Sequence, residues 1–200
     1  ASFVTNTTGD SNVAIGRGSL YSNTTANEIT AVGSCALFSN TTGADNVAVG
    51  FCALSCNTTA ALNTATGYLT LAANTTGAGN TASGYKALLA NTTGANNVAM
   101  GYFALGTNTT GTCNVAIGYK ALFDSNRGSG HEASYNVAVG SFAGHLNTTG
   151  HSNVSLGFEA LTAVTTGVQN TGLGNNSGNS LTTGSNNTII GNGAQAAAVN

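Results

Sequence analysis

The residues best suited to chemistry gather in one short stretch. Lys120, Asp124, Arg127, His131 and Glu132 lie close together and include four of the ten charged side chains of the chain. Asp124 and Glu132 form the only close carboxylate pair, and the spacing matches no metal motif. A local break in a repeat often carries binding. We therefore predict that these five residues form a surface contact or a neutral loop, and we predict no catalytic or metal site.

Histidines and cysteines are few, and their spacing fits no known motif. His145 and His151 follow this stretch, and we expect all three histidines on exposed turns. Cys35 and Cys52 are separated by the interval that recurs throughout the chain. If they occupy equivalent places in neighbouring strands, their Cα atoms lie about 5 Å apart, inside the range of a disulfide. Two interpretations stay open: a Cys35–Cys52 disulfide, or free thiols that face outward.

Aromatic residues recur at the same interval as the two cysteines. They form a candidate column of five: Phe51, Tyr68, Tyr85, Tyr102 and Tyr119. Such a column could stack on sugar rings, or it could stabilise the fold by packing ring against ring.

The triplet "NTT" occurs eight times and matches the N-glycosylation sequon. The candidate acceptors are Asn6, Asn23, Asn40, Asn57, Asn74, Asn91, Asn108 and Asn147. The alternative is that "NTTG" is turn chemistry, because Asn bonds its own backbone and Gly accepts positive φ.

Composition excludes several classes of function. The chain has no GxSxG, no HExxH and no phosphate-binding loop, so we predict that it is not an enzyme and binds no cofactor. Its net charge of −2 gives no electrostatic basis for binding nucleic acid or an anionic membrane. The apolar runs are too short to insert into a bilayer. Charged residues make up 5% of the chain, against about a quarter in ordinary globular domains.

These candidates are positioned by an internal repeat. The glycine that ends "VAxG" falls at positions 16, 33, 50, 67, 84, 101 and 118, in equal steps of seventeen, and the next step, to 140, is longer by five. We expect one repeat domain over 1–200, made of eleven units, with a five-residue insertion within 124–135.

The period predicts an all-β fold. A unit of this length can hold two short strands and two turns, which is one coil of a parallel β-solenoid. Within "VAIGYKALF" we expect Val115 and Ile117 inside, with Ala121 and Leu122 closing the coil. The asparagine four before each glycine, such as Asn114, could form an internal amide ladder.

The phrases "NTTGANNVAMGYFAL" and "NTTGTCNVAIGYKALF" resemble the head repeats of trimeric autotransporter adhesins and the shaft repeats of phage-type tail fibres. The resemblance covers nearly the whole chain. It implies a left-handed parallel β-roll, three chains around one axis, and an extracellular stalk or adhesive head. The repeat unit of this chain is longer than the usual adhesin-head repeat.

Repeat and resemblance together favour a structural protein. We expect a subunit of an extracellular fibre or adhesin, on a cell surface or a virion, that assembles with identical chains as a trimer or an end-to-end filament. It could also contact a cell-surface glycan or protein receptor. A homopolymeric filament is one alternative, and an ice-binding β-solenoid is another. The adjacent Thr pairs of "NTTG" do not suit ice binding, which needs Thr-x-Thr on a strand.

Overall fold

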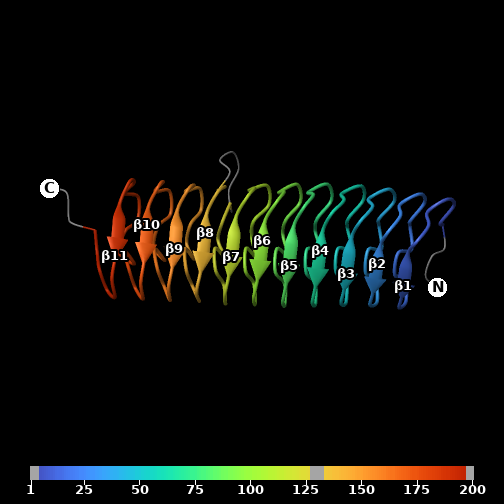
Figure 1. Ribbon diagram of the computed structural model, residues 1–200, viewed down its shortest axis with the longest axis horizontal. Coiled ribbons are helices and arrows are strands. Elements are labelled where there is room, and N and C mark those ends of the chain that lie inside the picture. The colour runs from blue at the N-terminus through green and yellow to red at the C-terminus, as the bar shows by residue number, and fades with distance from the viewer. Residues whose placement is uncertain (1–4, 127–132, 197–200) are drawn as a thin grey trace.

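The computed structural model describes residues 5–126 and 133–196 of the chain. These residues form no helix and eleven strands of three residues each, which lie side by side along a rod (Figure 1). The strands are β1 (Val13–Ile15), β2 (Thr30–Val32), β3 (Val47–Val49), β4 (Thr64–Thr66), β5 (Thr81–Ser83), β6 (Val98–Met100), β7 (Val115–Ile117), β8 (Val137–Val139), β9 (Val154–Leu156), β10 (Thr171–Leu173) and β11 (Thr188–Ile190).

All eleven strands form one parallel sheet in chain order, with the register of the repeat. Val13 of β1 pairs with Thr30 of β2, one repeat later. From β7 to β8 the step is longer, as Val115 pairs with Val137, so the five extra residues leave the sheet register undisturbed. The predicted parallel β-solenoid is confirmed, while the left-handed sense of its coil stays a prediction.

Each coil contributes one strand, where we expected two. After the corner glycine, alternate residues adopt left-handed backbone conformations: Lys120 has φ 51° and Leu122 has φ 48°. This alternation interrupts the extended backbone that a second strand needs. The coils still bond to one another here, since the Leu122 N–H donates to the Ala143 carbonyl at 3.0 Å. A left-handed L-residue costs roughly 1–2 kcal/mol, which these repeated bonds must offset.

The interior is built from small residues and leucine, which corrects our expectation for the strands. Ala116 is fully buried, while Ile117 is 37% exposed and Val115 is only half-buried. Successive strand residues point to opposite faces. The coil interior is narrow, and Ala121 and Leu122 already fill it from the other side. The alanine at the strand centre therefore points inward, and its larger neighbours point outward.

Two asparagine columns run through the interior. In the predicted column, the backbone N–H of Asn97 donates to Asn80 Oδ1 at 3.0 Å, and this pattern continues from Asn46 to Asn187. The second column is the asparagine of "NTT". Asn74 Nδ2 donates to Asn57 Oδ1 at 2.9 Å, and the chain of amides runs from Asn6 to Asn108. These bonds satisfy buried polar groups coil after coil.

The corner glycine is required by close approach of neighbouring coils. Gly101 has φ 133°, and a Cβ added to it would lie 2.5 Å from the Gly118 carbonyl oxygen. Only glycine combines this backbone conformation with so short a distance between neighbouring coils.

Candidate functional site

Two residues of the predicted contact site are placed by the structure. Lys120 and Asp124 lie in the coil of β7, whereas Arg127, His131 and Glu132 lie outside the described residues. A contact site made by all five residues therefore stays a prediction.

Lys120 belongs to an aromatic cluster that follows the corner glycine of its coil. Its Nζ lies 5.6 Å from the ring centroid of Tyr119 and 5.3 Å from that of Phe123, distances at which a cation is attracted to a ring face. The His145 ring stacks on Phe123 at 5.6 Å between centroids, and the Asp124 N–H donates to the His145 carbonyl. His145 is therefore half-buried by ring packing, while His151 is exposed as predicted.

The four cysteines are free thiols. Cys35 and Cys52 are partly buried in equivalent positions of neighbouring coils. Burial raises the pKa of the Cys52 thiol, and the charge and hydrogen bond of the Cys35 thiol raise it further. A raised pKa keeps Cys52 protonated near neutral pH, which lowers its reactivity as a nucleophile. The pair is present here as two partly buried free thiols, and a Cys35–Cys52 disulfide stays a prediction.

Seven of the eight sequon asparagines are buried in the rod, and Asn6 is partly buried. From Asn23 to Asn108 they are fully buried, and Asn147 is 2% exposed. Their Nδ2 atoms are occupied, as Asn91 Nδ2 donates to Asn74 Oδ1 at 2.8 Å and to the Gly94 carbonyl at 2.9 Å. This placement argues against glycosylation of the folded chain, because the amide nitrogen would first have to leave the interior.

The predicted aromatic column is a continuous stack of rings. Neighbouring centroids from Phe51 to Tyr119 lie 5.1–5.3 Å apart, with interplanar angles of 6–12°. Within the column each inner ring has both faces covered by its neighbours, so a sugar cannot lie flat on Tyr68, Tyr85 or Tyr102. The column exposes ring edges and phenol groups instead. This geometry favours ring packing over sugar stacking.

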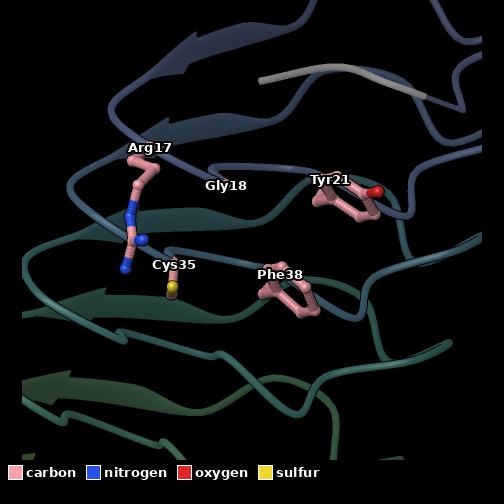
Figure 2. Close-up of a pocket in the computed structure, with 5 residues that line it drawn as sticks. All are labelled: Arg17, Gly18, Tyr21, Cys35 and Phe38. Atoms are coloured by element: carbon pink, nitrogen blue, oxygen red, sulfur yellow. The ribbon is translucent and has the colours of Figure 1, made fainter. Parts of the chain in front are cut away.

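A shallow pocket of about 260 Å³ lies near the first two coils. Figure 2 shows Arg17 on one side of Gly18 and the ring of Tyr21 on the other, with Cys35 and Phe38 in the next coil. The Tyr21 and Phe38 rings stack at 5.1 Å and form the apolar wall. The pocket forms where glycine replaces the side chain that neighbouring coils carry at this position.

The outward side of the sheet forms a continuous surface, which we call the strand face. It consists of the first and third residue of every strand from β1 to β11. Ile15, Val49, Met100, Ile117 and Val139 are among its exposed aliphatic side chains. No outward residue of these strands is charged.

Among residues 5–126 and 133–196, no group of three His, Cys, Asp or Glu side chains could hold a metal ion. The same part of the chain forms no helix with the length and apolarity of a membrane span. No family model, no curated protein and no solved structure matches the chain.

The sequence reasoning missed the strand face and the second asparagine column. The sequence did contain a signal for the strand face. The central strand residue is small in almost every unit, which indicates that it faces the narrow interior and that its neighbours face outward. The signal for the second was masked by turn chemistry, which explains "NTT" equally well.

Proposed function

We propose that the chain is a non-catalytic structural subunit of an extracellular fibre or adhesin, forming part of its shaft or head together with identical chains. The observation that supports this most is the uninterrupted stack. One sheet runs from β1 to β11, and its register continues across the insertion. A rod of ten inter-strand steps of about 4.8 Å is on the order of 50 Å long, which suits a spacer or shaft.

The interior supports a mechanical role. Each coil is bonded to the next through the sheet, and most coils also through the asparagine columns and the threonine that follows the buried asparagine. Thr41 Oγ1, for example, donates to the Thr58 carbonyl at 3.0 Å. Stacked repeats gain their stability from such neighbour contacts. Acid–base chemistry instead needs titratable groups positioned around a reacting atom, and among the described residues we find no such arrangement.

The proposal is tested on the native source. Antibodies against the chain should label whole cells or particles before permeabilisation, and the label should follow fibres or surface projections in electron micrographs. Labelling only after permeabilisation would contradict an extracellular fibre subunit.

Contact with a surface glycan is part of the proposal, and it can be tested separately. Binding to a glycan array should be lost in the Tyr85→Ala/Tyr102→Ala variant if ring edges and phenols recognise sugar. An array without hits would leave the aromatic column with a packing role alone.

Two alternatives have one specific observation each. Among the described residues, β1 and β11 pair on one side only, so stacking of β11 on β1 of another copy would give a filament. For ice binding, Thr64 and Thr66 both lie on the strand face, although most other coils carry aliphatic residues there. Micrographs of continuous filaments would favour the first alternative, and thermal hysteresis would favour the second.

A further inference from the structure

The strand face carries no charge, and the charged residues of the rod lie to either side of it. The acidic residues of the first coils, Asp10, Glu28 and Asp45, lie in the turns that precede the strands. Lys86 and Lys120 lie beyond the corner glycine. The solvent-facing side of a sheet usually carries polar or charged residues that alternate with the inward apolar ones. Here the outward residues are aliphatic or hydroxyl-bearing, which is typical of a surface that another molecule covers.

The area of this face reaches the lower end of the range for a specific contact. Ten steps of about 4.8 Å along the rod, and three residues of about 3.3 Å across it, give about 480 Å² in projection. Two copies docked through this face would cover about 960 Å² in total, close to the roughly 1,000 Å² that a specific interface needs.

The periodicity of the face is matched by a second copy of the chain. Its side chains repeat with the spacing of the coils, because each strand pairs in register with the next. A surface that matches this spacing over the whole length must have the same rise per repeat, and a second copy of the chain has it. A flat and uncharged face can also pack against itself around a two-fold axis or in a ring of copies.

We propose that the strand face is the surface through which copies of this chain dock side by side. This inference rests on the proposed function, since it names the contact that a fibre of identical chains uses. The aliphatic column of Val49, Met100, Ile117 and Val139 forms the centre of the contact.

The test compares two variants of equal charge. Val49→Lys/Ile117→Lys/Val139→Lys places three charges on the strand face. Thr42→Lys/Thr76→Lys/Thr93→Lys places three charges on exposed turn positions, outside the strand face. Mass is measured by light scattering over a series of protein concentrations, with circular dichroism as the check of folding. We expect the strand-face variant to associate at least about 100-fold more weakly than the wild type, because unpaired charge at an interface is costly. The turn variant should associate as the wild type does.

A milder variant keeps the test decisive if the lysines prevent folding. Val49→Thr/Ile117→Thr/Val139→Thr uses a residue that β4 already carries at this position, and it should weaken association about tenfold. Equal weakening of the strand-face and turn variants would overturn the inference, and so would assembly of every variant as in the wild type. In that last case the proposed function would stand, since another surface would hold the copies together. A wild-type chain that stays monomeric at every concentration would overturn both.

Discussion

The coils before the insertion and the coils after it share one repeat unit, but their interiors differ. From β1 to β7 every coil has a leucine in the same buried column, from Leu20 to Leu122. After the insertion this column holds Gly144, Leu161 and Gly178. The buried apolar residues accordingly form one cluster that ends at Ala143 and a second, small one around Leu161.

The asparagine column of "NTT" shows the same contrast. It is continuous up to Asn108, whose Oδ1 is buried without a partner because the next coil has Ser125 in its place. Asn147 Oδ1 is also buried without a partner, since Val164 follows it. All coils therefore keep the strand and its outward residues, whereas the coils after the insertion have fewer buried leucines and fewer bonds between buried asparagines. We expect amide exchange to be faster in the coils of β9 to β11 than in those of β3 to β6.

A corner glycine gives the largest expected effect. Gly101 and Gly191 have similar φ values of 133° and 126°, so alanine at either site costs about 1–3 kcal/mol in backbone strain. A Cβ added at Gly101 would lie 2.5 Å from a carbonyl oxygen. A Cβ added at Gly191 would have Ala194 Cβ as its nearest neighbour, at 3.7 Å. Gly101→Ala should lower the free energy of unfolding by more than about 4 kcal/mol, which is an exceptional loss for one residue. Urea unfolding followed by circular dichroism measures both variants. Equal losses would show that backbone strain alone matters.

The leucine column gives the next largest difference. Leu88 lies between Leu71 and Leu105, while Leu161 lies between Gly144 and Gly178. Leu88→Ala should cost about 3–5 kcal/mol and Leu161→Ala about 2–3 kcal/mol, because the second site loses fewer side-chain contacts. The same unfolding assay tests this order. A larger loss at Leu161 would mean that the second cluster is the more strongly packed of the two.

The asparagine column gives a smaller difference in the same direction. Asn74 donates to Asn57 Oδ1 and to the Gly77 carbonyl, and it accepts from Asn91. Asn147 Nδ2 donates to the Gly150 carbonyl, and its Oδ1 is the buried atom without a partner. Asn74→Ala should therefore cost about 2–3 kcal/mol and Asn147→Ala about 1 kcal/mol. Urea unfolding of the two variants gives the comparison. Similar values for both would show that the amide column is not cooperative.

Repair of the column is the smallest expected effect. Val164→Asn would offer an Nδ2 donor to the buried Asn147 Oδ1, but it removes a buried apolar side chain and places its own Oδ1 next to Leu181, so we expect a net change of less than about 1 kcal/mol. Val164→Ala is the control, since it removes volume without adding a donor and should cost about 1–2 kcal/mol. Thermal unfolding compares the two variants. If Val164→Asn is as damaging as Val164→Ala, the weak interior after the insertion is not caused by the missing amide.

The solenoid could be predicted from the sequence, because the repeat length equals the length of chain in one coil. Recurrence of glycine at one fixed interval predicted the coil, the parallel register and the absorbed insertion. It did not by itself show which side of "VAI" faces inward, because Val115 and Ile117 are the more apolar residues. The deciding signal was the small residue at the strand centre, which fits the narrow coil interior. The stack of rings from Phe51 to Tyr119 was predictable from the same spacing. Whether their faces or their edges meet solvent depends on ring rotation, which no spacing encodes.

The restored register at β8 has one more consequence. Five extra residues between Ile117 and Val137 change neither the pairing of β7 with β8 nor the asparagine column that crosses the same step. The connection between β7 and β8 thus accepts extra residues without a change in strand pairing. A foreign peptide grafted there would be displayed at a fixed height along a rigid support, and several grafts would be spaced by whole multiples of the coil rise. The choice of coil to lengthen therefore sets the position of the grafted peptide along the rod.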